Sequence, residues 1–382
     1  MPRMKNGSLV CIGSGIKSVG HFTLEAQGWI KHADLVVYCV ADPATEIWIK
    51  QNARRHFDLY TLYDNDKRRL QTYNEMIDVM VDNTRAGLDV CAVFYGHPGV
   101  FVLPTHRAIA ILREEGRDAM MLPAISALDC LIADIGFDPA TSGCQMVEAT
   151  DLLLRRRPML TESHVIVWQI GCVGDLGFRF AGYDNRNFGV LLEYLLEHYA
   201  ADQPVVHYTA SQFPVCASVC ERMPLEQLRG ANISGISTLY ISPAAQRPTV
   251  PEMAHKLGLR LKGQPAPAVA LRPETPAAAE RPTWVRDVPM KPYTPSKGRS
   301  GLATYIADLA QDPRILAAFR RDADLSSRTH AEMTDDERAA LLSRHAGRIR
   351  LALKAPEYPE LEKLEKLFGP VMPTSGARTD SH

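Results

Sequence analysis

The stretch SLVCIGSGIKSVGHFTLEAQGWIKHADLVVYCV (residues 8–40) decides the fold class, because it places a short apolar strand on either side of a helix over Thr23–His32. The same alternation continues to about residue 132, through apolar strands at 89–96 and 118–123. Strands that alternate with helices predict an α/β domain with a parallel sheet and helices on its faces.

A different pattern follows from residue 145 to about 247. Three apolar segments are typical of strands, at 164–171, 203–210 and 235–243, and one long helix is expected near Phe188–Tyr199. We therefore expect two lobes, about 1–132 and 133–247, the second being α+β with antiparallel pairing. A cleft between them is the expected place for a ligand.

Proline marks the end of the two lobes. The segment 248–298 carries many prolines, which predict an extended, semi-stiff arm. Residues 299–354 follow as a small helical module, and the tail 355–382 carries turn formers and little periodicity. The helices are predicted from an apolar stripe and from two helix starts, at Asp312-Pro313 and at Thr334 with Glu337.

Composition narrows the class of protein. Of 382 residues, 46% are hydrophobic, and 43 basic side chains nearly balance 44 acidic ones. The chain can therefore bury a large core, and its charge does not predict a nucleic-acid or membrane partner. The first strand begins too early for a signal sequence, and no apolar run approaches transmembrane length, so we expect a cytoplasmic protein.

The eight cysteines lie mostly in apolar segments, as reduced buried thiols do. Cys216 and Cys220 are close in sequence, but no second pair completes a zinc set, and we expect no metal.

The segment DLYTLYDNDKRRLQTY (58–73) gathers three phenols and a guanidinium. If Lys67–Thr84 is helical, Arg69 and Tyr73 lie four residues apart on one face. A fixed cation there would favour a tyrosinate, which could act as a general base for a weakly acidic proton. Half-buried packing residues are the alternative interpretation.

Three loops could contact a ligand. The first, Gly13-Ser14-Gly15, follows a strand, but the dinucleotide fingerprint is broken at Ser18, so a plain tight turn is the alternative. The second, YGHPGVF (95–101), lies at the carboxyl end of a parallel strand, where such sheets bind ligands, although His97 could be structural. The third, 123–127, turns into a helix and offers free amide donors.

These motifs occur together in the order of one family. From GSGI through YGHPGVF and LPAISALD to GISTLYI, residues 8–247 resemble the tetrapyrrole methylase superfamily, whose members are two-lobed and S-adenosylmethionine-dependent. Within it the chain is most similar to the peptide backbone N-methyltransferases of borosin biosynthesis, in YCVADPATE, DLYTLYDNDKRRLQTY, VFYGHPGVF, QIGCVGD, GYDNRNFGVL and PVVHYTA.

The resemblance implies residue roles. It implies that Arg69 and Tyr73 form the catalytic pair, with Tyr63 beside them and Tyr60 lining the same site. Around the methyl donor, released as S-adenosylhomocysteine, it places Tyr95, His97, Val100, Phe101, Ser126, Ala127, Gln169, Tyr208, Ala210, Ser237 and Thr238.

The resemblance also implies a peptide substrate. Residues 299–354 resemble the helical recognition domain of bacterial borosin precursors, so the tail 355–382 is the expected substrate, modified in trans within a homodimer. Three alternatives stay open: a separate precursor peptide, a tetrapyrrole, small-molecule or RNA methyltransferase, and a non-enzymatic scaffold that binds the donor.

Overall fold

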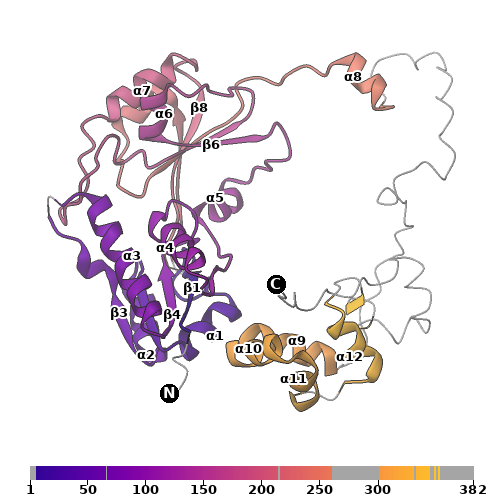
Figure 1. Cartoon of the computed structure of the whole chain (residues 1–382). Helices are drawn as coiled ribbons and strands as arrows, with labels where there is room; N and C mark the ends of the chain where they lie inside the picture. The colour runs from indigo at the N-terminus through magenta and orange to yellow at the C-terminus, as the bar shows by residue number, and fades with distance from the viewer. Residues whose placement is uncertain are drawn as a thin grey trace, which may run out of the picture. The chain divides into compact units, whose positions relative to one another are not determined.

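The computed structural model describes residues 6–65, 67–213, 216–259, 301–330 and 333–344, with residues 348, 349 and 352. The chain divides into one unit of residues 1–244 and 299–382 and a second unit of residues 245–298. The first unit holds two five-stranded sheets and a group of short helices (Figure 1).

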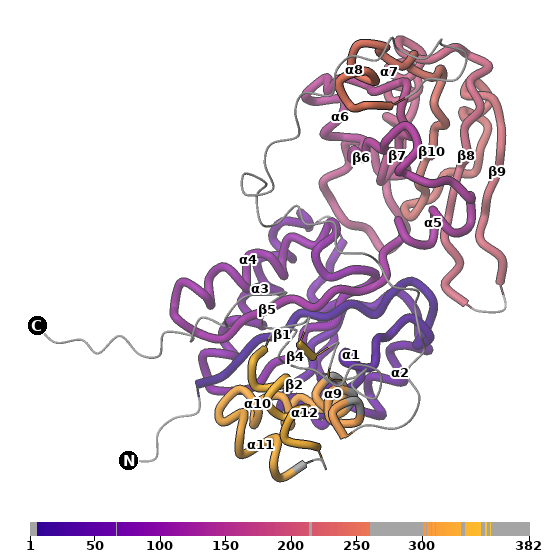
Figure 2. The backbone as a smooth tube through the Cα atoms, turned by 90° about the vertical axis from the view of Figure 1, so that its right-hand side faces the viewer, coloured from indigo at the N-terminus to yellow at the C-terminus, as the bar shows by residue number. Residues whose placement is uncertain are grey.

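The first lobe is a sheet of parallel strands covered on both faces, as its sequence predicts. Its strand order is β3-β2-β4-β1-β5, with β1 at Ser8–Gly13, β2 at Leu35–Cys39, β3 at His56–Asp58, β4 at Asp89–Phe94 and β5 at Ala119–Met121. Helices α1 (Leu24–His32) and α2 (Pro43–Asn52) lie on one face, and α3 (Arg69–Arg85) and α4 (Leu103–Glu114) on the other (Figures 1 and 2). The short edge strand β3 was not predicted.

Alternate residues of the central strands point to opposite faces, and both faces are apolar. Val10 and Ile12 pack in the core beneath α1 and α2, whereas Leu9 and Cys11 pack in the core beneath α3 and α4. Strands buried on both faces read as continuous hydrophobic runs, which is why this lobe could be predicted from its sequence.

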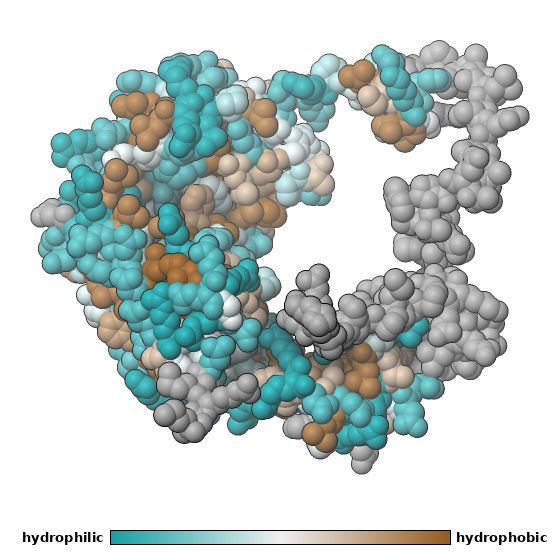
Figure 3. Space-filling view, in the orientation of Figure 1, coloured by the Kyte–Doolittle hydropathy of each residue, from teal (hydrophilic) through white to brown (hydrophobic). Residues whose placement is uncertain are grey.

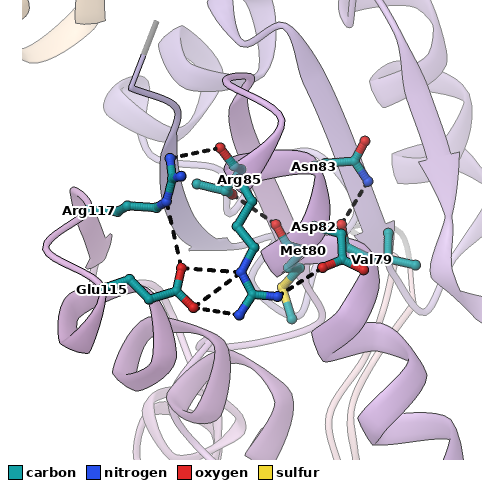
Figure 4. Close-up of polar contacts among 8 residues, drawn as sticks. Val79, Met80, Asp82, Asn83, Arg85, Glu115 and Arg117 are labelled. Carbon is teal, nitrogen blue, oxygen red and sulfur yellow. Dashed lines mark hydrogen bonds and ion pairs between the residues drawn. The ribbon is translucent and has the colours of Figure 1, made fainter. Parts of the chain in front are cut away.

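Helix α3 carries the predicted catalytic pair, and its far end is tied to α4 by ionic contacts (Figure 4). Arg85 donates from Nη2 to Glu115 Oε1 at 2.5 Å and from Nη1 to Asp82 Oδ1 at 3.1 Å. Arg85 holds the pKa of the Glu115 carboxyl below its usual value. These exposed pairs add little stability, but they join the ends of two helices whose other ends lie near the site.

The second lobe is a mixed sheet of order β6-β7-β10-β8-β9. Its strands are β6 (Cys144–Glu148), β7 (His164–Trp168), β8 (Pro204–Thr209), β9 (Val219–Pro224) and β10 (Thr238–Ile241). Pairing is antiparallel as predicted except between β6 and β7, which run parallel. Strands β6 and β9 were not predicted, because polar residues interrupt their apolar pattern.

Helices pack on both faces of this second sheet. Helix α7 (Phe188–Leu196) occupies the position of the predicted long helix, and α6 (Ala149–Arg155) shares its core. Helix α5 (Ala127–Ile135) packs on the opposite face, where Leu131 meets Trp168 and Tyr208.

The helical module has a small core of its own. Its helices are α9 (Gly301–Gln311), α10 (Pro313–Arg321), α11 (Ala323–His330) and α12 (Asp335–Leu342), around buried Leu302, Tyr305 and Leu341. Both predicted helix starts are confirmed. Asp312 accepts from Arg314 N–H, and Thr334 forms a capping box with Glu337.

The second unit is described only near its start, where α8 spans Pro251–Lys256. Most of the predicted arm and all of the predicted tail lie outside the described residues. None of the helices that the structure describes is both long and apolar enough to cross a membrane.

Candidate active site

A cavity of about 290 Å³ is lined by residues of both lobes. The first lobe contributes the segment that follows β4 and the inner side of α3, and the second contributes the ends of β7 and the turn before β10. Several large apolar side chains on this unit are exposed, including Val100, Phe101 and Ile236 at the cavity, and brown patches interrupt its teal surface (Figure 3). Aromatic and aliphatic walls with a few polar groups are typical of a small-molecule site.

Two lining residues have an uncommon backbone conformation. Phe101 and Gln169 adopt φ angles of 58° and 59°, in the left-handed region that non-glycine residues seldom occupy. The Phe101 ring lies 5.9 Å from the ring of Trp168, which precedes Gln169. Strained residues concentrate at ligand sites, so this pair of loops is built for something other than stability.

The loop Gly13-Ser14-Gly15 packs against the loop 95–101 and supports it. Gly15 and Gly96 exchange backbone hydrogen bonds of 3.0 and 3.2 Å, and both adopt positive φ angles. A side chain at Gly13 would overlap the Gly96 carbonyl. The Gly13-Ser14-Gly15 segment is therefore a turn that packs against YGHPG, in agreement with the broken fingerprint.

Polar groups face the cavity from the loop 95–101 and from the start of α5. His97 Nδ1 accepts from Gly99 N–H at 3.0 Å, so in the neutral ring Nε2 carries the hydrogen and can donate. At the start of α5, the Ser126 N–H is taken by Asp129 at 2.6 Å and the Leu128 N–H by Ser126 Oγ at 3.2 Å. The expectation of several free amides was wrong there, because a capping box uses them; Ala127 N–H has no acceptor among the described residues.

The predicted catalytic pair, Arg69 and Tyr73, lies on successive turns at the start of α3. Tyr73 lines the cavity, and Arg69, one turn earlier, is held by the second lobe. Its guanidinium donates to the Asp175 carbonyl oxygen and lies over the Tyr183 ring, 5.4 Å from the centroid. The guanidinium is thus fixed beside Tyr73 by groups that are far away in sequence.

Backbone pairing between the lobes fixes this arrangement further. Arg69 N–H donates to the Leu176 carbonyl at 3.2 Å, and Phe178 N–H donates to the Lys67 carbonyl at 3.2 Å. The segment 175–178 of the second lobe therefore runs as a short antiparallel partner of 67–69.

An aromatic cluster stands beside the pair. The Tyr63 ring lies 4.4 Å from Phe178, and Tyr60 lies 5.5 Å from Tyr63 and 6.0 Å from Phe178. Phe180 completes the cluster at 5.1 Å from Phe178. Tyr60 and Phe180 are exposed, so the cluster offers an apolar surface to a ligand larger than the cavity.

Burial changes the acidity of the phenols. It raises the pKa of Tyr73 above its ordinary value, while Arg69 and the Tyr63 hydroxyl act in the opposite direction. The pKa of Tyr63 is raised further, by burial and by the neighbouring Tyr73. The expected tyrosinate is therefore not the resting form. Arg69 favours it, but desolvation is the larger effect, and Tyr73 is the phenol of the two that ionises first.

Most of the predicted site residues meet at this cavity. Its lining includes Tyr63, Tyr73, Tyr95, His97, Val100, Phe101, Ser126, Ala127, Gln169, Ser237 and Thr238. Arg69 and Tyr60 lie beside it, not in its wall. Tyr208 and Ala210 belong to the core beneath α5, and the buried Tyr208 hydroxyl donates to Asp134 at 2.8 Å.

Sequence reasoning missed several groups at the site. Trp168 and Cys39 line the cavity, and Asp175 and Tyr183 hold Arg69. The last two lie within the motifs QIGCVGD and GYDNRNFGVL, which could have drawn attention to them, but nothing local indicates that they reach Arg69.

The cavity suits the sulfonium nucleoside that the family resemblance implies. Aromatic faces of Tyr95, Phe101 and Trp168 can contact an adenine ring or a sulfonium cation. His97 and Ala127 offer hydrogen-bond donors, and Ser237 and Thr238 also line the cavity. Within the described parts of the chain, no cluster of three or more His, Cys, Asp or Glu side chains could hold a metal ion.

Comparison with known proteins agrees with this geometry. The family of tetrapyrrole (corrin/porphyrin) methylases matches residues 8–210, and the borosin biosynthesis clasp domain matches residues 286–373, a span that includes the helical module. The methyltransferase/ribosomally synthesized cyclic peptide omphalotin A precursor of Omphalotus olearius is 41% identical over 92% of this chain and 88% of its own length.

A second relative gives the same result. The methyltransferase/ribosomally synthesized type I borosin cyclic peptide precursor of Coprinopsis marcescibilis is 42% identical over 93% of this chain and 94% of its own. The chain therefore belongs to the tetrapyrrole methylase family, among its borosin methyltransferase–precursor fusions, and is an S-adenosylmethionine-dependent methyltransferase.

Proposed function

We propose that this enzyme methylates backbone amide nitrogens of a peptide, and that the peptide is its own tail, residues 355–382, received from a partner subunit of a homodimer. The observation that carries the first part is the position of Tyr73, which faces the donor cavity while Arg69 is held beside it from the other lobe.

The choice of base follows from the cavity wall. Among the described residues, those that line it include no carboxylate, and His97 Nδ1 accepts from Gly99 N–H. The titratable groups that remain in the lining are the thiol of Cys39 and the phenols of Tyr63, Tyr73 and Tyr95. Among these, Tyr73 has the guanidinium of Arg69 beside it to stabilise its ionised form. A base of high pKa suits a proton as weakly acidic as that of an amide.

The proposed reaction transfers one methyl group to the amide nitrogen and removes one proton from it. When bound, the donor supplies an electrophilic methyl group and leaves as S-adenosylhomocysteine. Tyr73, once its own proton has been released to solvent, takes the amide proton as the nitrogen–carbon bond forms, and the Tyr63 hydroxyl donates to the Tyr73 oxygen and stabilises its ionised form. Arg69 compensates the charge on the Tyr73 oxygen, and the aromatic cluster around Phe178 excludes water.

A peptide substrate is supported by two further observations. The exposed rings of Tyr60 and Phe180 extend the apolar surface beyond the donor cavity, as a chain with apolar side chains requires. The two relatives compared above are named as methyltransferases and as peptide precursors at once, and this chain covers about nine-tenths of each. In the tail itself, Leu367, Phe368 and Val371 carry backbone N–H groups, whereas Pro370 and Pro373 do not and cannot be methylated.

The test is tandem mass spectrometry of the C-terminal proteolytic fragment from the full chain. Successive methyl increments on backbone nitrogens within 355–382 are expected, and Tyr73→Phe should remove them. Tyr199→Phe is the matched control, because the buried Tyr199 hydroxyl has no hydrogen-bond partner in the structure. A fully unmodified tail in a donor-binding wild-type protein would contradict self-methylation and favour a separate precursor peptide.

Action in trans has its own test. A Tyr73→Phe chain is expressed together with an active chain whose tail carries a distinguishable mass. Methylation of the Tyr73→Phe tail is expected if subunits exchange tails within a dimer. Its absence, with the active chain's tail fully methylated, would show that each chain modifies itself.

A further inference from the structure

Outside the residues already assigned, one buried polar network touches the donor cavity. His207 in β8 lies opposite Glu221 in β9, and His207 Nδ1 is 2.8 Å from Glu221 Oε2. On its other side, His207 Nε2 is 2.7 Å from Ser237 Oγ. Ser237 lines the cavity, so the network runs from the exposed edge strand to the cavity wall.

The hydrogen positions in this network follow from the chemistry of its ends. The Glu221 carboxylate can only accept, so Nδ1 of His207 carries the hydrogen. In the neutral ring Nε2 then accepts, and the Ser237 hydroxyl must donate to it. Ser237 Oγ also accepts from Ser234 N–H at 2.9 Å, and Ser234 Oγ lies 3.3 Å from it, farther than in a normal O–H···O bond, so one lone pair of Ser237 is left. Toward the cavity, Ser237 can therefore accept a hydrogen bond but cannot donate one.

The turn that carries Ser237 is held from its other side as well. A side chain at Gly171 would overlap the Ser234 carbonyl, and one at Gly235 would lie within 2.5 Å of the Tyr183 ring. Tyr183 in turn lies beneath the Arg69 guanidinium. The position of the 234–237 turn therefore affects the donor wall directly and the catalytic pair through Tyr183.

We propose that His207 and Glu221 are positioning residues of the donor site: Glu221 orients His207, and His207 Nε2 accepts the Ser237 hydroxyl hydrogen and so presents Ser237 as an acceptor for an N–H group of the methyl donor. This inference rests on the proposed function only in taking the cavity as the donor site. A sulfonium amino-acid nucleoside offers two such groups, its ammonium and its adenine amine.

The same three residue types serve as nucleophile, base and orienting acid in hydrolases. Here the serine is 1% exposed, and its oxygen is already bonded to Ser234 N–H. An attacking oxygen would need room beside it for an acyl carbon and its substituents, whereas an oxygen in the cavity wall that accepts from an N–H group needs room for one hydrogen only. The burial therefore favours positioning over nucleophilic catalysis.

The test measures binding of S-adenosylhomocysteine to the full chain by titration calorimetry. The amide of His207→Gln can reach Ser237, whereas that of His207→Asn can reach only Glu221. We expect His207→Asn and Ser237→Ala each to weaken binding about tenfold, and His207→Gln to stay within about threefold of wild type. Glu221→Ala should weaken binding about threefold, and exposed Glu226→Ala, on the following 3-10 helix, should leave it unchanged.

Kinetics and a double variant separate positioning from packing. In His207→Asn the KM for the donor should rise, while kcat should stay within about twofold of the wild-type value. Adding Ser237→Ala to His207→Asn should weaken donor binding little further. Equal weakening by His207→Asn and His207→Gln with equally lowered melting temperatures, or no weakening by His207→Asn, would overturn the proposal. Labelling of Ser237 by a fluorophosphonate would also overturn it. A wild-type chain that does not bind S-adenosylhomocysteine would instead overturn the proposed function.

Discussion

The two lobes of this methyltransferase are sheets of different kinds, and they contribute different parts of the site. The first is all parallel and buried on both faces, and it supplies Tyr63 and Tyr73 from the segments around α3. The second is mixed, with the exposed polar strand β9 at one edge, and it supplies Gln169 and Ser237 from turns.

Both lobes line the donor cavity, but their segments are held in position in different ways. In the parallel sheet, strand carboxyl ends meet at one edge, so loops such as the one containing His97 are positioned by local motifs. In the mixed sheet, a turn is positioned by strand pairing and by contacts such as His207 with Ser237. Variants of the Arg69–Tyr73 segment in the first lobe should change the rate, and variants of the 234–237 turn in the second should change donor binding.

The largest effect should come from breaking the proposed catalytic pair, Arg69 and Tyr73. Arg69→Met should lower the single-turnover methylation rate about 100-fold, because the ionised Tyr73 loses its compensating charge. Affinity for S-adenosylhomocysteine should change less than twofold. Arg68→Met, at the exposed neighbouring position, is the control, and a matching loss of donor affinity in Arg69→Met would contradict the division between the lobes.

The pH dependence of the methylation rate tests the part of the site on α3. In the proposed mechanism Tyr73 acts as the phenolate, and burial raises its pKa above the ordinary value of about 10. The single-turnover rate at saturating donor should therefore rise about tenfold per pH unit between about pH 7 and pH 9. A plateau near neutral pH would identify a base of lower pKa.

A substitution beside the 234–237 turn of the second lobe should change donor binding instead of the rate. Gly171→Ala should weaken S-adenosylhomocysteine binding about tenfold, since the added methyl group would displace the Ser234 carbonyl and the turn with it. Gly230→Ala, where a side chain meets nothing within 4 Å, is the matched control. If Gly171→Ala lowered only kcat at saturating donor, the turn would serve the chemistry instead.

The smallest effect should come from the helical module. Tyr305 and Ser326 share a buried 2.7 Å hydrogen bond between α9 and α11. Tyr305→Phe should destabilise the module by about 1 kcal/mol, seen as faster amide exchange in α9. Donor binding in the two lobes should stay unchanged, and a loss of affinity would show that the module supports the cavity.

Much of the first lobe and part of the site could be predicted from the sequence. Continuous apolar runs indicated the parallel strands, and the spacing of Arg69 and Tyr73 placed them on one helix face. The capping signals at Asp312 and Thr334 were sufficient for the module's helix starts, because those interactions are local. Strands β6 and β9 were missed since exposed strands carry no apolar pattern.

The sequence by itself determined the residue types of the site: phenols beside a guanidinium, a glycine-rich loop with His97, and the turn with Ser237. Only the tertiary structure decided which groups hold Arg69, why Tyr73 is protonated at rest, and how His207 sets the hydrogen of Ser237. The physical reason is that burial and hydrogen bonds between distant strands control acidity and orientation. Neither can be read from neighbours along the chain.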